Sequence, residues 1–122
     1  MLLEEHRIDI ERIWQKASVV QGIDSNLYRK DSAGAWIYRY AYEDMDSIFG
    51  WVIDHIFPKA LGGDDNLINL RPMNWVNERS KMNDYPHYIA DVVSDGNRNI
   101  YKRKQCTVNQ KIQIALKQLY GK

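Results

Sequence analysis

The sequence predicts an α+β fold in one domain spanning residues 1–122, and three observations lead to that class. A chain of 122 residues can form one hydrophobic core but is too short for two. Apolar residues make up 44% of the chain and charged residues 27%, as is usual for globular proteins. Segments with helical periodicity are interspersed with short strand-like segments. A lone cysteine, Cys106, excludes an internal disulfide and any zinc site built from several cysteines.

The first half of the chain predicts one helix followed by two strands. Residues 3–20 place apolar side chains close to the 3.6-residue period of a helix. Residues 35–42 are rich in aromatic side chains, which favour a strand. Residues 50–57 form a second apolar strand, and Pro58 ends it because proline cannot donate to a sheet. The Gly62-Gly63 pair marks the loop that follows.

The second half predicts a helix, a β-hairpin and a final helix. Residues 73–82 are expected to be helical, beginning just after Pro72. Residues 88–94 and 99–105 flank a glycine turn, which is the pattern of a hairpin. Thr107 is the expected N-cap of the last helix, with Gln110 as its capping-box partner, and Gly121 is expected to end it.

Charge is divided unevenly along the chain, although the formal net charge is only +1. Residues 1–95 carry 10 basic and 16 acidic side chains, whereas residues 96–122 carry 7 basic side chains and no acidic one. This basic C-terminal extension, the second hairpin strand plus the last helix, is either a solvated surface or a surface that binds a polyanion. No signal-peptide pattern and no membrane-length apolar run is present, so we expect a cytoplasmic protein without a membrane partner.

The residues that suggest chemistry lie between Trp51 and Lys81, in the segment WVIDHIFPKALGGDDNLINLRPMNWVNERSK. Asp54 and His55 are adjacent, so they can face one site only if the strand ends or bulges there. Aspartate is a suitable ligand for Mg²⁺ or Mn²⁺, and neutral histidine is the usual general base near neutral pH. The amide of Asn69 could accept a hydrogen bond from the ring of His55 and so fix its tautomer.

This segment resembles the HNH family of nucleases, also called ββα-metal or His-Me finger nucleases. The shared pattern is Asp-His-Ile-x-Pro, then Gly-Gly, then Asn-Leu, then a helix with a metal ligand and a lysine, and it occupies residues 50–84. A wider likeness to small bacterial and phage HNH proteins covers residues 10–85, including the Tyr28-Arg29-Lys30-Asp31 stretch. Arg29 and Asp31 could form an ion pair or contact phosphate. The resemblance implies a ββα-metal core with an N-terminal helix, an added β-hairpin and a C-terminal helix.

The resemblance also implies a role for each matched residue. His55 corresponds to the general base, Asn69 to the residue that orients it, and Lys81 to a helix lysine that would face phosphate. Asp54 corresponds to a ligand of one divalent metal ion, Mg²⁺ or Mn²⁺ first, with Zn²⁺ and Ni²⁺ as alternatives. Glu78 occupies the position where the family most often has Asn or His as second ligand, and Asn77 and Asn74 are the alternative ligands.

The function expected from this resemblance is a metal-dependent endonuclease that hydrolyses phosphodiester bonds in nucleic acid, with DNA ahead of RNA. The alternative is an HNH-fold module, impaired by Glu78, that binds nucleic acid or protein without cutting. An immunity or recognition protein is a further partner that such small nucleases have. The basic residues expected to bind the nucleic acid are Arg71, Arg79, Arg98, Lys102, Arg103 and Lys104.

Overall fold

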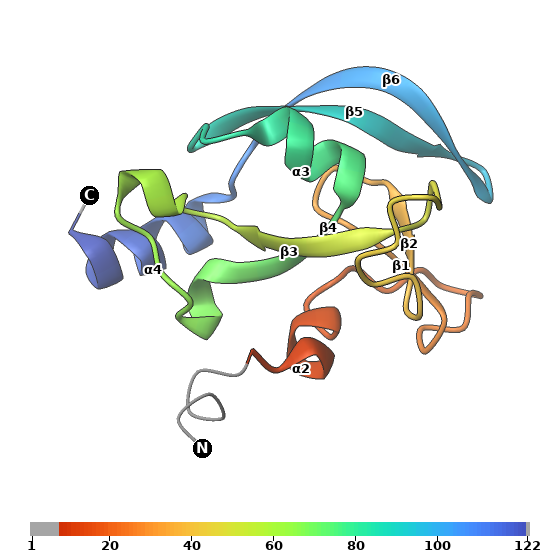
Figure 1. Ribbon diagram of the computed structural model, residues 1–122, viewed down its shortest axis with the longest axis horizontal. Coiled ribbons are helices and arrows are strands. Elements are labelled where there is room, and N and C mark those ends of the chain that lie inside the picture. Colours follow the sequence, from red (N-terminus) through yellow and green to blue (C-terminus); the bar gives the residue numbers. More distant parts are fainter. Residues whose placement is uncertain (1–7, 122) are drawn as a thin grey trace.

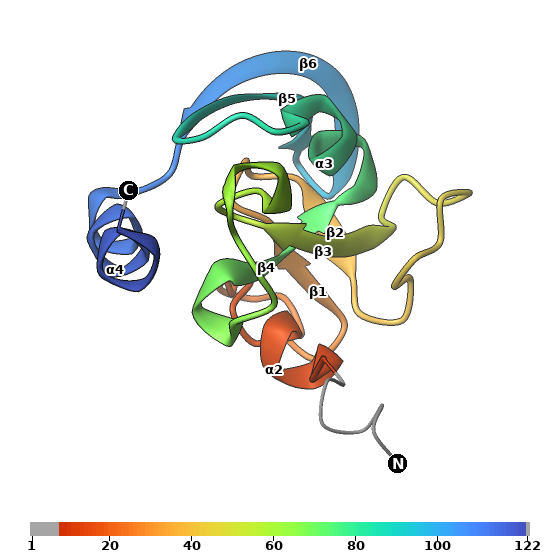
Figure 2. The ribbon, with the colours of Figure 1, turned by 60° about the vertical axis from the view of Figure 1, so that its left-hand side comes forward.

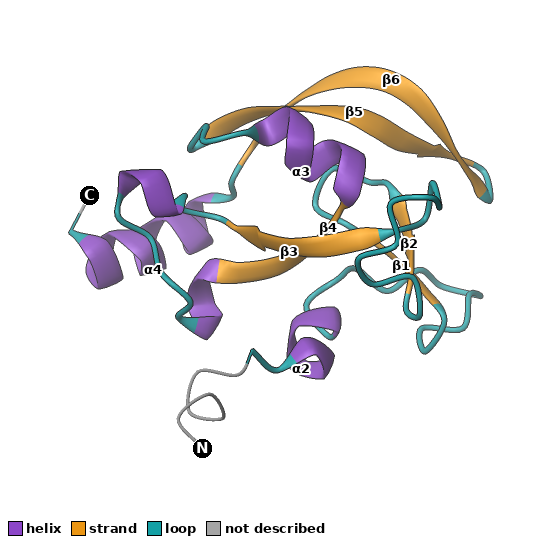
Figure 3. Ribbon diagram, viewed as in Figure 1, coloured by secondary structure: helices purple, strands orange, loops and turns teal. Residues whose placement is uncertain are grey.

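The computed structural model describes residues 8–121, and this part of the chain mixes α-helices with small antiparallel sheets. The predicted α+β class is therefore confirmed. Three two-stranded sheets are formed by neighbouring strands within these residues. Figure 3 shows how the helices are distributed around them. The elements in chain order are α2 (Ile10–Trp14), β1 (Tyr28–Lys30), β2 (Trp36–Tyr38), β3 (Trp51–His55), β4 (Leu70–Asn74), α3 (Trp75–Lys81), β5 (His87–Asp95), β6 (Arg98–Thr107) and α4 (Gln110–Tyr120).

The centre of the molecule is a hairpin of β3 and β4 followed directly by α3. The two strands are antiparallel, with Asp54 opposite Arg71 and His55 opposite Leu70. The predicted helix over residues 73–82 begins two residues too early, because Asn74 ends β4 and caps α3 by accepting a hydrogen bond from the backbone of Val76 at 2.9 Å. The helix consequently starts at once and packs back against the hairpin.

The β5–β6 ribbon arches over α3, which lies between this ribbon and the β3–β4 hairpin (Figures 1 and 2). The predicted hairpin is confirmed, and its strands are longer than the sequence indicated. The ribbon is irregular between Ala90 and Val92. At that irregularity the buried amide of Asn77 accepts from the backbone N–H groups of Asp91 and Val92 and donates to the carbonyl of Val92, at 2.8 to 2.9 Å. Asn77 therefore joins α3 to the ribbon.

The N-terminal helix is much shorter than predicted. Of the residues expected to be helical, 3–7 lie outside the described part of the chain, and α2 covers only Ile10–Trp14. Ser18 pairs with Lys30 through two backbone hydrogen bonds, which requires extended backbone at a position predicted to be helical. The predicted strand over residues 35–42 is likewise reduced to Trp36–Tyr38, because the chain turns at Ala41.

Arg29 and Asp31 are both buried, but they do not form an ion pair with each other. Arg29 donates to the backbone carbonyls of Ser25, Gln15 and Ala17, and so it holds the chain that follows α2. Asp31 instead accepts from backbone N–H groups and from Asn77. Both side chains therefore connect segments of the fold and neither is free to contact phosphate.

Two groups of buried side chains form the core. The first includes Trp14 and Trp51, whose rings lie 5.4 Å apart, and it packs α2 against the central hairpin. The second includes Phe57, Tyr88, Val108 and Leu116, and it packs α4 against the chain that follows β3. Burying apolar surface of this kind is the main favourable term in folding.

The last helix is confirmed, but its expected N-cap is wrong. Asn109, and not Thr107, caps α4 by accepting from the backbone of Ile112 at 2.9 Å, while Thr107 still belongs to β6. Gly121 ends the helix with a φ of 74°, a conformation that glycine adopts without strain. Across residues 8–121 no helix combines the length and the apolar character needed to cross a membrane.

Candidate active site

Three of the residues predicted to carry chemistry meet at a small cleft beside the end of β3. Asp54, His55 and Glu78 all line this cleft, which has a volume of about 150 Å³. Asp54 and His55 come from the last two positions of β3, and Glu78 comes from α3. Because β3 ends at His55, the usual alternation of side chains along a strand does not separate the two neighbours. Asn83, just beyond α3, lines the same cleft.

Asp54 is buried, with 3% of its surface exposed, and two cationic side chains hold its carboxylate. Its Oδ2 accepts from Nε of Arg71 at 2.8 Å, and its Oδ1 lies 3.3 Å from Nζ of Lys81. Burying a carboxylate is costly unless its charge is compensated, and this pairing supplies the compensation. The Asp54 carboxylate is thus fixed at the edge of the cleft by contacts from β4 and α3.

Lys81 does not lie where the resemblance implied. Only 1% of its surface is exposed, and it does not line the cleft. Its Nζ donates to the carbonyl of His55 at 3.1 Å and contacts Asp54. Burial lowers the pKa of Lys81, and the charge of Asp54 opposes that shift. Lys81 therefore positions two cleft residues from inside the molecule, because the buried Asp54 requires a cationic partner.

Asp65, and not Asn69, is the residue that contacts the ring of His55. Nε2 of His55 and Oδ1 of Asp65 are 2.7 Å apart, and Lys59 lies 3.5 Å from the same oxygen. This hydrogen bond lowers the pKa of the Asp65 carboxyl. No hydrogen bond within residues 8–121 involves Nδ1 of His55, so that nitrogen is available to accept a proton. Sequence reasoning missed Asp65; the only signal was the Asp64-Asp65 pair in the glycine loop.

Asn69 holds the loop between the two strands. Its amide donates to the carbonyls of Phe57 and Asp64 at 3.0 and 3.1 Å, and its oxygen accepts from the backbone of Phe57 at 2.7 Å. The side chain is fully buried and uses its hydrogen-bonding groups in these contacts. At Gly63 a Cβ atom would lie 1.8 Å from the carbonyl oxygen of Phe57, so only glycine fits where the loop closes.

Glu78 is half-buried and makes no side-chain hydrogen bond to the residues between 8 and 121. Burial raises the pKa of its carboxyl, and the nearby charge of Asp54 raises it further. Two carboxylates that repel each other beside one cleft fit a bound cation, which would relieve that repulsion. Mg²⁺ is commonly held by one or two carboxylates together with water and phosphate oxygens. Within the described residues no group of three His, Cys, Asp or Glu side chains is arranged to hold a metal.

The alternative ligands Asn74 and Asn77 lie away from the cleft. Asn74 is fully buried, caps α3 and donates to the carbonyl of Ile48 at 2.8 Å. Asn77 is also fully buried, and its amide is used by the β5–β6 ribbon and by Asp31. Neither side chain lines the cleft, so Glu78 is the residue of α3 that can join Asp54 there.

The predicted nucleic-acid-binding residues differ in their exposure and in the partners that the fold gives them. Arg71 is buried, pairs with Asp54 and lies with its guanidinium 5.1 Å from the ring centre of Tyr88, so its charge already compensates a carboxylate inside the fold. Lys104 donates to the carbonyl of Ala33 at 2.9 Å. Lys104 and the remaining four residues are exposed. Arg98 and Arg103 pair with aspartates of β5, Arg79 stacks on Trp75, and Lys102 has no carboxylate partner within residues 8–121.

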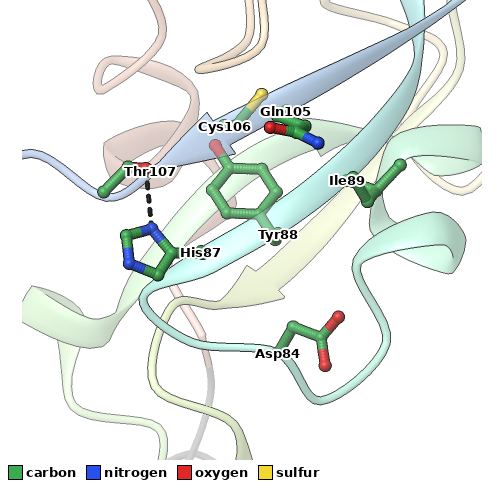
Figure 4. Close-up of a pocket in the computed structure, with 7 residues that line it drawn as sticks. All are labelled: Asp84, His87, Tyr88, Ile89, Gln105, Cys106 and Thr107. Atoms are coloured by element: carbon green, nitrogen blue, oxygen red, sulfur yellow. Dashed lines mark hydrogen bonds between the residues drawn. The ribbon is translucent and has the colours of Figure 1, made fainter.

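A larger cleft at the start of the β5–β6 ribbon contains none of the predicted site residues. Its volume is about 490 Å³, and Figure 4 shows Asp84 on the loop after α3, well apart from His87 and Thr107. Nδ1 of His87 is 2.9 Å from Oγ1 of Thr107, so this histidine bonds to a neighbouring strand. Burial raises the pKa of the Cys106 thiol, which disfavours the reactive thiolate. Of the expected catalytic and metal-binding residues, Asp54, His55 and Glu78 line the smaller cleft, and none lines this larger one.

Comparison of the chain with protein-family models finds no match, and comparison with curated proteins and with solved structures finds none either.

Proposed function

We propose that this protein is a metal-dependent endonuclease of the HNH type, with His55 as the general base and one divalent cation held by Asp54 and Glu78. The observation that carries the proposal is the meeting of these three side chains at one cleft. The β3–β4–α3 unit, with the cleft at the end of β3, supports the ββα-metal core that the sequence resemblance implies. The resemblance lies in the same residues, 50–84.

The proton-transfer step follows from the environment of His55. Its Nε2 is held by Asp65, so the neutral ring carries its proton on Nε2 and presents an unprotonated Nδ1. Nδ1 takes a proton from the water that attacks the phosphorus atom, and the bond from phosphorus to the leaving ester oxygen breaks as the new bond forms. The ring becomes a cation that the Asp65 carboxylate stabilises. A positioned base of this kind typically accelerates a reaction by about 10²–10⁴-fold.

Asp54 and Glu78 would hold the cation, and the fold restrains their two side chains to different degrees. Lys81 and Arg71 fix the position of Asp54, whereas Glu78 has no partner in the described chain and can adjust. A divalent cation bound there would stabilise negative charge on the scissile phosphate. Mg²⁺ and Mn²⁺ suit two carboxylate ligands best, and Zn²⁺ or Ni²⁺ would be expected to make more use of an imidazole.

We propose nucleic acid as the substrate, and DNA ahead of RNA. The exposed Arg79 follows Glu78 on α3 and stacks on Trp75, and its positive charge acts on the Glu78 carboxyl. Lys102 lies on the β5–β6 ribbon that arches over this helix. Phosphate contacts of this kind position a nucleic acid without reading its sequence, so we expect cleavage with little sequence preference.

The test is a cleavage assay on supercoiled plasmid and on an RNA transcript of matched length. We expect DNA cleavage with Mg²⁺ or Mn²⁺, none with EDTA, and a loss of at least about 10²-fold in rate for His55→Ala. His87→Ala is the matched control, because His87 lies outside the cleft. Cleavage that survives both EDTA and the loss of His55 would disprove the mechanism.

A second candidate function is favoured by the pairing of Asp54 with Arg71 and Lys81. Both oxygens of that carboxylate already face a cationic group, which weakens its attraction for a metal ion. The protein would then bind nucleic acid, or a protein partner, without cutting it. Glu78→Asn separates the two functions, because it restores the ligand type that the family most often has. An inert wild type with an active Glu78→Asn variant would establish the binding module for the natural chain.

A further inference from the structure

We infer that Tyr120 on the C-terminal helix is a positioning residue for His55, acting through the loop between β3 and β4. The inference rests on the proposed function, since it concerns the residue assigned as general base. It also gives the last helix a role other than that of a basic surface. The evidence is a series of contacts from α4 to the loop, and from the loop to the imidazole ring.

The loop touches Tyr120 at two separate points. The ring of Tyr120 stacks on the ring of Phe57, with centres 5.3 Å apart and planes 24° apart. Its hydroxyl donates to Oδ1 of Asp64 at 2.5 Å and accepts from the backbone N–H of Asp64 at 3.2 Å. The bond to the Tyr120 hydroxyl lowers the pKa of the Asp64 carboxyl. Phe57 follows His55 by two residues and Asp64 precedes Asp65, so Tyr120 contacts the loop at its start and again next to Asp65.

Asn69 holds the same two residues from inside the molecule. Its amide bonds to the backbone of Phe57 and to the carbonyl of Asp64. The loop is therefore held by a buried asparagine and by a half-buried tyrosine. Removing one of the two should loosen the loop without unfolding the β3–β4 hairpin, whose own hydrogen bonds do not involve Tyr120.

The position of Asp64 determines where Asp65 lies. Asp65 is exposed, and its contacts within the described chain are with His55 and Lys59. Both of these partners are side chains, and neither fixes the backbone of Asp65. The Asp65 carboxylate therefore stays in contact with the His55 ring only while the loop backbone on either side of Asp65 is held. Tyr120 supplies part of that restraint through Asp64. The hydrogen bond that fixes the His55 tautomer consequently depends on α4.

The C-terminal helix is itself well placed to hold the loop. Leu116 is buried in the second core group, together with Val108 just before the helix. Asn109 caps one end, and Gly121 ends the other directly after Tyr120. Tyr120 therefore extends from a helix that is anchored along its length, and Figure 1 shows this helix beside the segment that follows β3.

The test compares Tyr120→Phe with Tyr101→Phe, a matched control at an exposed tyrosine of β6. The Phe variant keeps the stacking on Phe57 and loses only the hydroxyl. The first readout is the ¹⁵N NMR spectrum of the His55 ring, in which the two ring nitrogens report which of them carries the proton. We expect one tautomer, protonated on Nε2, in the wild type and in Tyr101→Phe, and a mixture of tautomers in Tyr120→Phe.

The second readout is cleavage kinetics. We expect Tyr120→Phe to lower kcat by about threefold to tenfold with KM unchanged, because the restraint acts on the base and not on substrate binding. Tyr120→Leu also removes the stacking and should have the larger effect. If Tyr120→Leu does not fold, Tyr120→Phe alone decides, because it retains the ring in the core.

Two outcomes would overturn the inference. One is a His55 spectrum in Tyr120→Phe identical to that of Tyr101→Phe. The other is a kcat for Tyr120→Phe equal to that of the control, where cleavage is measurable. A wild-type protein that cuts no nucleic acid would disprove the proposed function alone, because the tautomer of His55 is read without turnover.

Discussion

Asp31 and Asp54 have the same exposure, 3% of their surface, but the fold compensates their charges in different ways. Asp31 accepts from three backbone N–H groups and from the amide of Asn77, all of them neutral donors. Asp54 is held by two cationic side chains, Arg71 and Lys81. Burial raises the pKa of Asp31, and its hydrogen bonds oppose that shift only in part.

This difference in hydrogen-bonding and ionic partners distinguishes the roles that the two carboxylates can have. Asp31 joins the turn between β1 and β2 to the junction of β4 and α3, and both of its oxygens are used in doing so. Asp54 makes no such bridge to backbone groups, and it lines a cleft. Cationic side chains can shift when a metal ion or a phosphate arrives, whereas backbone donors cannot move without the fold. A buried carboxylate held by backbone is therefore structural, and one held by side chains at a cleft can function.

The largest effect is expected from Asp31→Ala, which removes the acceptor for four donors at once. A buried donor without a partner costs about 1–3 kcal/mol, and relaxation keeps the total below the sum, so we expect a loss of about 3–5 kcal/mol in the free energy of unfolding. Urea denaturation measures it. Asp46→Ala at an exposed aspartate is the control and should change stability by less than about 0.5 kcal/mol. A loss below about 1 kcal/mol for Asp31→Ala would contradict the structural role.

A smaller effect is expected from Asp54→Asn, because the amide oxygen can still accept one hydrogen bond. The variant leaves Lys81 and Arg71 without a carboxylate, and we expect it to cost about 2–3 kcal/mol of unfolding free energy. Adding Lys81→Met should recover part of that loss, since an unpaired buried ammonium is then removed. A double-mutant cycle measures the coupling between the two positions. Strictly additive losses would mean that the two charges do not stabilise each other.

How far the sequence could predict the candidate site depends on which element carries each residue. The Asp54, His55 and Glu78 trio was predictable because its spacing is carried by one strand and one helix, whose geometry is regular. Asp65 was not, because a loop places its residues through contacts that come from elsewhere in the chain. Here those contacts are made by Asn69 and by Tyr120, which lies 56 residues beyond Asp64.

In the fold, too, local sequence signals predict some elements, and contacts from distant parts of the chain determine others. The β5–β6 ribbon and α4 were predictable because alternation, helical period and terminal glycine are local signals. The predicted helix over residues 3–20 was too long because Arg29 and Lys30 draw the following backbone into other hydrogen bonds. The capping role of Asn74 and the ribbon contact of Asn77 were also hidden. Each of these asparagines lies next to or inside a helix, and its hydrogen-bond donors can be identified only from the fold.

Glu78 is a third carboxylate, and among residues 8–121 it has neither a backbone donor nor a cation within ion-pair distance. Because burial and Asp54 raise its pKa above the ordinary value of 4.5, protons compete with a metal ion there more strongly than at an exposed carboxylate. We expect Mn²⁺ affinity to rise as the pH is raised above the ordinary carboxyl range, because Glu78 loses its proton there. Glu78→Gln should weaken binding about tenfold and flatten this rise. Calorimetric titration measures both, with Glu43→Gln as the exposed control.

An unchanged pH dependence in Glu78→Gln would show that Glu78 is not a ligand. Retained affinity in that variant would lead to the same conclusion. Asp54→Asn should also weaken Mn²⁺ binding, because it removes the other proposed carboxylate ligand. Loss of binding in both variants is the result that the proposed metal site requires.

The smallest effect is expected on the surface, where paired and unpaired charges can be compared on one strand. Arg103 lies 3.0 Å from Asp91, whereas its neighbour Lys102 has no carboxylate partner among residues 8–121. Each phosphate contact made by a free cation adds about 0.9 to the slope of log K against log salt concentration. We therefore expect Lys102→Ala to reduce the slope for a short DNA duplex by about 0.9, and Arg103→Ala to reduce it by less. Fluorescence anisotropy in EDTA measures binding without cleavage.

Comparing Lys102→Ala with Arg103→Ala distinguishes two properties of the basic C-terminal extension. One is its total charge, and the other is whether each cation is free to contact phosphate. Both remove one positive charge from β6, so a surface that attracts DNA only through its total charge would respond equally to each. A carboxylate that already neutralises Arg103 reduces the counterions that its phosphate contact can release, so local pairing makes the responses unequal. Equal slopes would show that the Arg103–Asp91 pair opens when DNA binds, which a weak exposed pair permits. No change in either slope would place the nucleic acid away from the ribbon and leave Arg79, on α3, as the remaining exposed contact.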